Sequence, residues 1–346
     1  RQPEIFFTES YIRNQEINDT YPPYNRPRSV LHWLAEKRLR PSTWVVLLDP
    51  DMLMRAPLVI PSAATFPADL LYTGRSPLDV ALSLPAIGQR YPYMAARWRD
   101  AALNLSEICD PQAQSCQQLT QDELSEYFAV GPPWIMSFSD LCRAAPLWDA
   151  YVPRIRKHYR QLIAEMYAYS LAFASIGVRH FVVDHYVVSY PNAPPSEHAW
   201  PWVDKALAAG VNPCDASGRT IDETIRGPTF LHYCEIYHSE AWYFRKRDVP
   251  HDKLLSCNAP LLAEPSAALL NRRRGDRDSE GTDQLAYRNA RHAWFLCTLL
   301  PALNDALADI RFAICPGGVY NDSRSLRVEP PGTFYQALRS FFQDGR

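Results

Sequence analysis

The sequence feature that most constrains the fold is a short apolar run that ends at two carboxylates. Residues 44–48 read Trp-Val-Val-Leu-Leu, and Asp49, Pro50 and Asp51 follow immediately. A continuous apolar run of this length, stopped by acidic residues and proline, is typical of a buried parallel strand that feeds a loop. We therefore expect a strand at 44–48 and a polar loop that begins at Asp49.

Other short apolar runs alternate with helical patterns along the chain. We expect strands at 134–138, 181–188 and 229–233, and helices at about 154–176 and 285–313. Gly177 stands where a helix C-cap needs a left-handed residue, and Pro301 is expected to break the last helix into two. Strands that alternate with helices predict an α/β fold.

Composition narrows the function classes. Of the 346 residues 47% are apolar, so the chain can bury a substantial core. The 36 Lys and Arg residues nearly balance 38 Asp and Glu residues, which excludes a strongly basic nucleic-acid binder. Only 13 glycines are present, and the glycine-rich phosphate-loop motifs are absent from the sequence. If the protein binds a nucleotide, it must hold the phosphates by means other than a glycine-rich loop.

The cysteines and the N-glycosylation motifs indicate in which cellular compartment the protein is found. Three N-x-[ST] motifs begin at Asn18, Asn104 and Asn321, and the eight cysteines form an even set without zinc-finger spacing. Cys109 and Cys116 bracket a short polar segment that a disulfide could close. Eight buried free thiols in a cytosolic enzyme are the alternative, but the two features together favour the secretory pathway. No run of 18 apolar residues occurs, so we expect no membrane-spanning segment in this chain.

The Asp49-Pro50-Asp51 sequence is the strongest chemical signal. Two carboxylates two residues apart can hold a hard divalent cation, whose free positions take the oxygens of a nucleotide diphosphate. His232, at the end of the apolar run 229–233, could complete the ligand set, although a lone histidine is more often structural. Residues 245–247, Arg-Lys-Arg, suit a diphosphate neighbour or form an ordinary basic surface.

Two further acidic residues interrupt apolar segments. Glu165 lies within an otherwise apolar helical stretch, and Asp184 interrupts the run 181–188. Each could supply an acid, a base or a hydrogen bond to a substrate, or could simply face solvent.

Four stretches in a fixed order carry a resemblance to a known family. They are Tyr21-Pro-Pro-Tyr-Asn-Arg-Pro with His32-Trp-Leu, then Leu48-Asp-Pro-Asp-Met-Leu-Met-Arg55, then Ala145-Pro-Leu-Trp148 before Glu165-Met-Tyr-Ala-Tyr169, and last Leu231-His-Tyr233 followed by Trp242, Phe244 and Lys246. This combination resembles the plant and green-algal peptidyl O-glycosyltransferases, which comprise hydroxyproline O-arabinosyltransferases and peptidyl serine α-galactosyltransferases.

The resemblance implies a fold and its extent. It implies a GT-A-like, Rossmann-like glycosyltransferase core with a mixed sheet over residues 1–265, followed by a loop and helical C-terminal extension over 266–346. The family has a strand–helix–strand unit ahead of the Asn25-Arg26-Pro27 region, and about 20 residues precede that region here. We therefore expect this N-terminal unit to be missing from the chain.

The resemblance also implies roles for five residues in donor binding. Asp49 and Asp51 would bind Mn²⁺ or Mg²⁺, and His232 would complete the metal shell. Arg26 and Lys246 would face the diphosphate of a UDP-sugar, to which Asp49 is linked through the metal.

The remaining implications concern the reaction itself. Glu165 and Asp184 would lie near the sugar or the acceptor. The protein would transfer arabinofuranose or galactose, with retention at the anomeric carbon, to hydroxyproline or serine of a Hyp/Ser-rich polypeptide in the Golgi or endoplasmic reticulum lumen, or outside the cell. Two alternatives remain: a catalytically inactive glycosyltransferase-like binding module, and a metal-dependent hydrolase built on the same residues.

Overall fold

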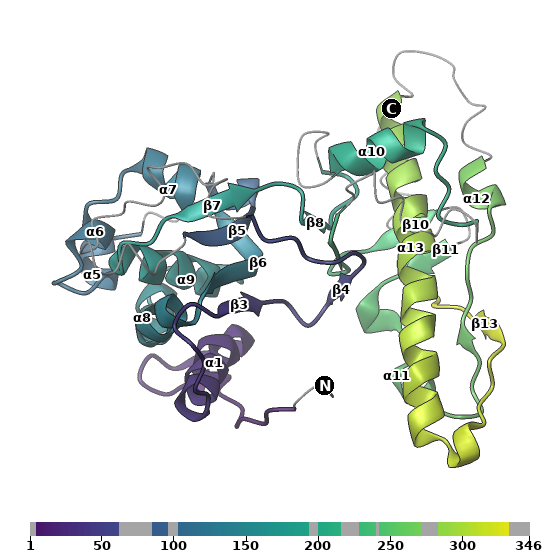
Figure 1. Cartoon of the computed structure of the whole chain (residues 1–346), viewed down its shortest axis with the longest axis horizontal. Coiled ribbons are helices and arrows are strands. Elements are labelled where there is room, and N and C mark those ends of the chain that lie inside the picture. Colours follow the sequence, from purple (N-terminus) through teal and green to yellow (C-terminus); the bar gives the residue numbers. More distant parts are fainter. Residues whose placement is uncertain are drawn as a thin grey trace. The chain divides into compact units, whose positions relative to one another are not determined.

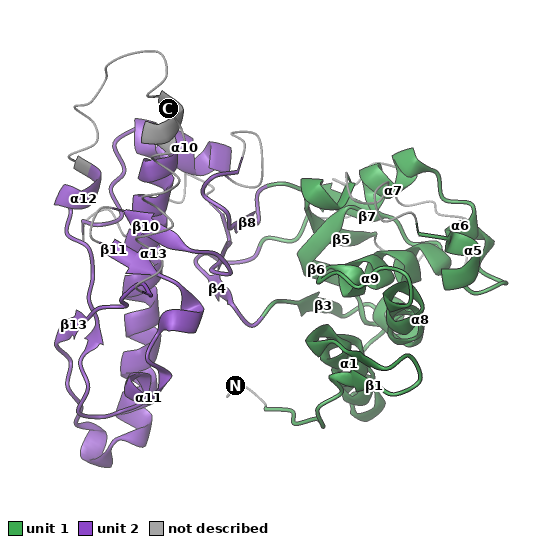
Figure 2. Cartoon of the chain, turned by 180° about the vertical axis from the view of Figure 1, so that it is seen from behind, with its two compact units in different colours: residues 1–49, 59–184 green, residues 50–58, 185–346 purple. Residues whose placement is uncertain are grey.

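The chain folds into two compact units (Figure 1, Figure 2). The computed structural model describes residues 5–61, 85–95, 103–193, 200–215, 228–239, 242–271 and 283–331. Unit 1 comprises Arg1–Asp49 and Val59–Asp184, and unit 2 comprises Pro50–Leu58 and His185–Arg346. The chain therefore passes between the units three times, after Asp49, after Leu58 and after Asp184.

Unit 1 is built around a mixed sheet. Its described strands are β1 (Arg13–Asn14), β2 (Asp19–Thr20), β3 (Trp44–Leu47), β5 (Ala86–Arg90), β6 (Val130–Ser137) and β7 (His180–Val183). Its described helices are α1 (Asn25–Glu36), α5 (Leu105–Ile108), α6 (Gln114–Gln117), α7 (Gln121–Tyr127), α8 (Phe138–Arg156) and α9 (Ala164–Ser175), with a 3-10 turn η1 (Pro22–Tyr24) before α1. Unit 1 thus alternates helices and strands, as the sequence predicts.

The sheet of unit 1 has the order β3-β6-β5-β7. β3 pairs antiparallel with β6, β6 pairs antiparallel with β5, and β5 pairs parallel with β7. The expected strand at 44–48 is confirmed, but the expectation that it is a buried parallel strand is wrong. β3 lies at the edge of this sheet, and among its residues Val45 alone is fully buried.

The predicted long helix at 154–176 is two helices in the structure. α8 ends at Arg156 and α9 begins at Ala164, and the two pack against each other. The expected stop at Gly177 is confirmed, because Gly177 has a φ of 72° and donates its N–H to Ala174 O, while Val178 N–H donates to Phe173 O. These two bonds are the Schellman pattern that satisfies the last carbonyls of a helix.

A buried ion pair attaches the β1-β2 hairpin to α8. Arg156 Nε and Nη2 donate to the Asp19 carboxylate at 2.7 Å and 2.8 Å, and both side chains are less than 10% exposed (6% and 5%). Tyr24 OH donates to the same carboxylate at 2.9 Å. The hydrogen bond from Arg156, opposed by burial, lowers the pKa of Asp19. The hairpin that precedes α1 is therefore held by a charge pair that is almost fully shielded from water.

Unit 2 contains several small sheets and one long helix. Its described strands are β4 (Met52–Met54), β8 (Val187–Val188), β9 (Phe230–His232), β10 (Tyr237–Ser239), β11 (Trp242–Phe244), β12 (Leu261–Leu262) and β13 (Arg324–Leu326). Its described helices are α10 (Trp200–Ala208), α11 (His251–Leu254), α12 (Ala268–Asn271) and α13 (Asp283–Ile314), with 3-10 turns η4 (Lys246–Asp248) and η6 (Pro316–Gly318). The predicted strand at 181–188 is divided, because β7 belongs to unit 1 and β8 pairs with β9 in unit 2.

Helix α13 forms much of the core of unit 2. Trp294, Phe295, Leu299 and Leu300 are buried in one cluster with residues of β8, β9, β11 and β12. Pro301 lies inside the helix, so the predicted break there is wrong. A proline removes one backbone hydrogen bond, and the buried contacts on both sides of it outweigh that loss.

The same helix passes a length and composition test for a membrane span. The stretch Arg288–Ile314 is long and apolar enough to cross a bilayer, and 50% of its most apolar window is buried within the protein. Core helices of soluble proteins pass this test too, and α13 carries the buried Arg291, His292 and Arg311. The absence of a membrane segment stays a prediction.

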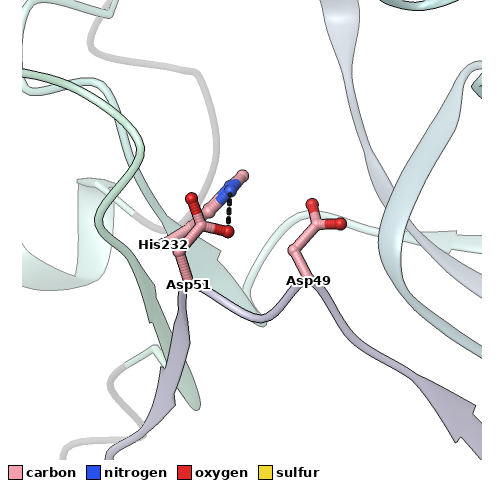
Figure 3. A group of neighbouring side chains, drawn as sticks. All are labelled: Asp49, Asp51 and His232. Atoms are coloured by element: carbon pink, nitrogen blue, oxygen red, sulfur yellow. Dashed lines mark ion pairs between the residues drawn. The ribbon is translucent and has the colours of Figure 1, made fainter. Parts of the chain in front are cut away.

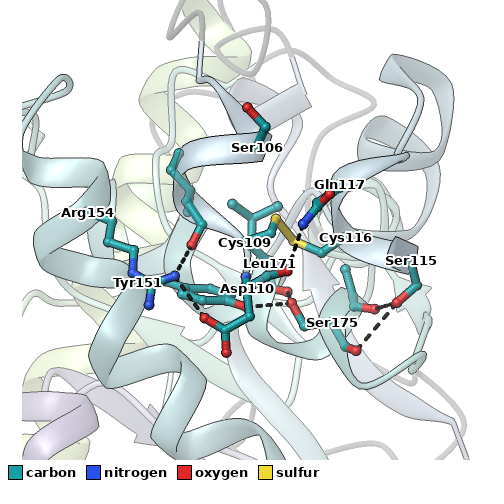
Figure 4. The surroundings of a disulfide bond; sticks show 12 residues. Ser106, Cys109, Asp110, Ser115, Cys116, Gln117, Tyr151, Arg154, Leu171 and Ser175 are labelled. Carbon is teal, nitrogen blue, oxygen red and sulfur yellow. Dashed lines mark hydrogen bonds and ion pairs between the residues drawn. A yellow bond between two sulfur atoms is a disulfide. The ribbon is translucent and has the colours of Figure 1, made fainter. Parts of the chain in front are cut away.

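Three disulfides are present, so the alternative of eight free thiols is wrong. They join Cys109 to Cys116, Cys214 to Cys297 and Cys257 to Cys315, while Cys142 and Cys234 carry free thiols. The Cys109–Cys116 bridge confirms the expected closed loop (Figure 4).

Hydrogen bonds fix the Cys109–Cys116 loop onto α8. Asp110 accepts from Arg154 Nη1 at 2.9 Å through its carboxylate and donates its N–H to Tyr151 OH at 3.0 Å (Figure 4). Gln117 Nε2 closes the loop by donating to Asp110 O at 2.8 Å. Disulfides persist in oxidising compartments, so the three bridges are consistent with a protein outside the cytosol.

The predicted division into residues 1–265 and 266–346 stays a prediction. The compact units follow other boundaries, and α13 packs in one core with β8 and β9. Part of the predicted extension, including residues 332–346, lies outside the described residues.

Removal of the buried charge pair is expected to destabilise unit 1. Asp19→Ala leaves the guanidinium of Arg156 buried without its carboxylate, so the free energy of unfolding should fall by about 3 kcal/mol. Urea unfolding followed by tryptophan fluorescence measures this loss. Glu107→Ala is the matched control, because Glu107 pairs with His158 where both side chains are 57% exposed. That control should change stability by less than about 0.5 kcal/mol, and an equal effect of both variants would contradict the account.

A buried histidine predicts a dependence of stability on pH. His180 is fully buried between Tyr127 O and Tyr169 OH, and burial lowers its pKa from 6.5 to about 3. Between these two values the unfolded chain binds a proton that the folded chain does not, so stability falls as the pH falls.

The change His180→Gln should remove this contribution. Urea unfolding at several pH values between about 4 and 6 should show a slope that is shallower by up to about 1.4 kcal/mol per pH unit than in the wild type. His158→Gln, at an exposed position, should leave the slope unchanged. An unchanged slope in His180→Gln would contradict the prediction.

Candidate metal and donor site

The candidate site begins at the loop that joins β3 to β4. Asp49 ends the first segment of unit 1 and Asp51 precedes β4, with Pro50 alone between them. β4 pairs antiparallel with β9, so that Met52 faces His232, and Tyr233 N–H donates to Asp51 O at 3.0 Å. This strand pairing places His232 beside the carboxylate of Asp51.

Within unit 2, Asp51 contacts two basic side chains. His232 Nε2 lies 3.3 Å from Asp51 Oδ1, and Lys246 Nζ donates a hydrogen bond to Asp51 Oδ2 (Figure 3 shows the histidine pair). The side chains of Asp51 and His232 are 13% and 12% exposed, whereas that of Lys246 is 36% exposed. Lys246 begins the 3-10 turn η4, directly after β11 and Arg245.

The pKa shifts follow from these contacts. Burial alone would raise the pKa of Asp51, but hydrogen bonds from His232 and Lys246 outweigh it and lower the pKa well below 3.8. Burial alone would lower the pKa of His232, but hydrogen bonds with Asp51 and with the Cys234 thiol raise it to about 9. Asp51 is therefore ionised, as a metal ligand must be, whereas His232 would release its proton when its nitrogen binds a metal ion.

Within unit 1, Asp49 is held by an arginine from the start of α1. Arg26 Nη2 donates to Asp49 Oδ1, and Arg26 Nη1 donates to Glu165 Oε2 at 3.1 Å. One guanidinium therefore bridges two carboxylates, one at the end of β3 and one in the first turn of α9. Arg26 also lies 5.2 Å from the centre of the Trp134 ring, which gives the cation an aromatic contact.

Glu165 is held in place by groups far away in the sequence. Its side chain is 3% exposed, its N–H donates to Tyr21 OH at 3.0 Å, and its carbonyl accepts from Trp148 Nε1 at 3.1 Å. Burial raises the pKa of Glu165, and Arg26 and Trp148 oppose that shift. Among the described residues, its Oε1 is buried and has no hydrogen-bond partner. One oxygen of this carboxylate therefore accepts a hydrogen bond from Arg26, and the other has no hydrogen-bond partner among the described residues.

The residue types of the loop fit a hard divalent cation. Asp49, Asp51 and His232 each offer one ligand atom, and these atoms all lie within 4.8 Å of one another (Figure 3). Two carboxylate oxygens with one imidazole nitrogen are ligands that Mn²⁺ and Mg²⁺ accept, Mn²⁺ more readily because of the nitrogen. This acidic and histidine group could therefore hold a metal ion.

Asp184 follows β7 and has a different partner. Arg90 Nε, at the end of the neighbouring strand β5, donates to Asp184 Oδ1 at 2.9 Å. Both side chains are about 40% exposed, at 39% and 42%. Asp184 is thus partly exposed and paired with Arg90, and its role near a substrate stays a prediction.

The structure brings the predicted residues into two groups. Arg26 and Glu165 join Asp49, and Lys246 and His232 join Asp51. Sequence reasoning assigned no role to Tyr21, Trp134, Trp148 and Cys234, which contact these groups. Tyr21 and Trp148 belong to the stretches that carry the resemblance. Their position in those motifs is the one sequence feature that could have marked them as site residues.

Comparison with known proteins gives one relative of interest. The sequence is 26% identical over 281 residues to a peptidyl serine alpha-galactosyltransferase from Arabidopsis thaliana, an alignment that covers 75% of this chain and 27% of the relative. This chain therefore spans about a quarter of the length of that protein. No family model and no solved structure matches the sequence.

The comparison and the site support the same general class. The relative is a glycosyltransferase, and the described residues form a mixed α/β structure that is compatible with that class. The group of Asp49, Asp51 and His232 could bind the metal on which many transferases of nucleotide sugars depend. The sequence is thus similar to part of a glycosyltransferase, and the described α/β structure is compatible with that class.

Proposed function

We propose that the protein is a metal-dependent glycosyltransferase that transfers arabinofuranose or galactose from a UDP-sugar to hydroxyproline or serine of a Hyp/Ser-rich polypeptide. The observation that carries the proposal is that Asp49, Asp51 and His232 offer ligand atoms within 4.8 Å of one another, while Arg26 pairs with Asp49 and Lys246 pairs with Asp51. The similarity to a peptidyl serine alpha-galactosyltransferase supports galactose as the sugar and a peptide serine as the acceptor, while arabinofuranose and hydroxyproline rest on the resemblance.

In the proposed site, Asp49, Asp51 and His232 hold Mn²⁺ or Mg²⁺. The metal would neutralise the negative charge that develops on the leaving diphosphate. Arg26 and Lys246 supply positive charge beside these two aspartates, which suits a ligand that carries several anionic oxygens. This arrangement removes the need for a glycine-rich phosphate loop, in keeping with the low glycine content.

Glu165 and Asp184 are proposed to act on the sugar or acceptor side. Glu165 keeps Arg26 in position through its Oε2 and lies buried in the first turn of α9. Asp184, half exposed beside Arg90, can accept a hydrogen bond from a polar substrate group. The hydroxyl proton of the acceptor can pass to an oxygen of the leaving diphosphate, so a strong protein base is not required. Retention at the anomeric carbon is part of the proposal.

The proposed setting is the secretory pathway, in the Golgi or endoplasmic reticulum lumen, or outside the cell. The three disulfides support this setting, because such bridges are rare in the reducing cytosol. The proposed catalytic domain is the GT-A-like region over 1–265, and neither a nucleic acid nor a membrane segment of this chain takes part in the reaction.

Two other functions use the same residues. A glycosyltransferase-like binding module would bind UDP or peptide without turnover. A metal-dependent hydrolase would release phosphate from phosphoesters without any acceptor. The strongly charged and partly buried loop favours a working metal site, and the similarity to a transferase favours sugar transfer over phosphoester hydrolysis.

Transfer to peptide is the expected outcome of the decisive assay. The full chain with Mn²⁺ should transfer sugar from UDP-galactose or UDP-arabinofuranose to a Hyp/Ser-rich peptide, as measured by the mass of the peptide and by UDP release. Asp51→Asn should reduce the rate on the order of 100-fold, because it removes the charge of a metal ligand. Nuclear magnetic resonance of the product should show the anomeric configuration of the donor.

Asp252→Asn on α11 is the matched control, since Asp252 lies on an exposed turn of unit 2. It should keep the wild-type rate. Binding of UDP without turnover would identify the binding module, and phosphoester hydrolysis without transfer would identify the hydrolase. Either outcome would overturn the proposed function.

A further inference from the structure

Both oxygens of Asp51 already contact basic groups of the protein. Oδ1 faces His232 Nε2 at 3.3 Å, and Oδ2 accepts a hydrogen bond from Lys246 Nζ. A divalent cation that binds this carboxylate therefore meets the positive charge of Lys246 at the same group. Two cations at one carboxylate repel each other, and the repulsion is stronger where the carboxylate is 13% exposed than in bulk water.

Lys246 differs from Arg26 in its freedom to leave its aspartate. Arg26 is anchored by Glu165 at 3.1 Å and by the ring of Trp134, so its guanidinium keeps its place even if the contact to Asp49 is lost. Lys246 has Asp51 as its described ion-pair partner, and its side chain is 36% exposed on a flexible four-carbon stem. Lys246 can therefore exchange one anionic partner for another without disturbing a buried contact.

We infer that Lys246 is an exchangeable counter-charge, which Asp51 holds until a divalent cation takes that carboxylate and which then binds the diphosphate of the donor. This inference rests on the proposed metal and donor site and adds a coupling between its two ligands. Metal binding releases Lys246 from Asp51, and the released ammonium strengthens the binding of the nucleoside diphosphate. By linkage, the diphosphate strengthens metal binding by the same factor.

The inference predicts that one substitution strengthens the binding of Mn²⁺ and weakens the binding of UDP. Lys246→Met keeps most of the length of the side chain and removes its charge, so Mn²⁺ alone should bind about three- to fivefold more tightly, as expected for the loss of one partly exposed competing cation. In the presence of saturating Mn²⁺, UDP should bind about tenfold more weakly, because one charge-assisted hydrogen bond to phosphate is lost.

Both affinities can be measured on the full chain without any turnover. Electron paramagnetic resonance of free Mn²⁺ gives the Kd of the metal alone, and isothermal titration calorimetry gives the Kd of UDP at fixed Mn²⁺. Lys253→Met is the matched control, because Lys253 is an exposed lysine of α11 in the same unit. It should change neither Kd.

The possible results separate this inference from the proposed function. If the wild type binds Mn²⁺ and UDP but Lys246→Met binds Mn²⁺ equally or more weakly, the exchange is overturned and the proposed function stands. If Lys246→Met leaves UDP binding unchanged, the diphosphate is not the second partner and the exchange is again overturned. If the wild type binds no Mn²⁺, the proposed function itself fails, and the inference fails with it.

Discussion

The compensation of charge on two neighbouring aspartates is the interaction on which the site depends. Asp49 and Asp51 stand on either side of Pro50, and partly buried carboxylates this close together are costly unless cations balance them. Arg26 balances Asp49 within unit 1, and Lys246 with His232 balances Asp51 within unit 2. The same concentration of negative charge makes the loop suited to a divalent metal ion.

In each unit a strand pairing positions groups that surround one of the aspartates. In unit 1, the pairing of β3 with β6 sets Leu47 opposite Trp134, whose ring lies under Arg26. In unit 2, the pairing of β4 with β9 sets Met52 opposite His232. The register of β4 with β9 therefore places His232 beside Asp51, and a slip of one residue would turn His232 to the opposite face of its sheet.

Features that depend on neighbouring residues could be predicted from the sequence. The strand before Asp49, the helix stop at Gly177 and the short Cys109–Cys116 loop each follow from local chemistry, and each is present. His232 could be proposed as a partner of Asp51 because it ends an apolar run of strand length. The resemblance to glycosyltransferases supplied the remaining link, since nothing local joins residue 51 to residue 232.

Features that depend on distant packing could not be predicted. The contact of Arg26 with Glu165 spans 139 residues, and that of Tyr21 with Glu165 spans 144. Pro301 reads as a helix break, but the buried side chains of α13 keep the helix continuous. The antiparallel pairing of β3 could not be predicted either, because an apolar run of this length does not indicate the direction of the neighbouring strand.

The most direct test of the central claim is to detect the nitrogen of His232 on a metal bound at this loop. Electron spin echo envelope modulation of the Mn²⁺-loaded chain reports nitrogen nuclei that are coupled to the metal. Because the sequence has nine histidines, His232→Gln must be compared with His251→Gln on the exposed turn α11. The account predicts nitrogen modulation in the wild type and in His251→Gln, and its loss in His232→Gln. A wild-type signal from hydrated Mn²⁺ alone, or modulation that persists in His232→Gln, would contradict it.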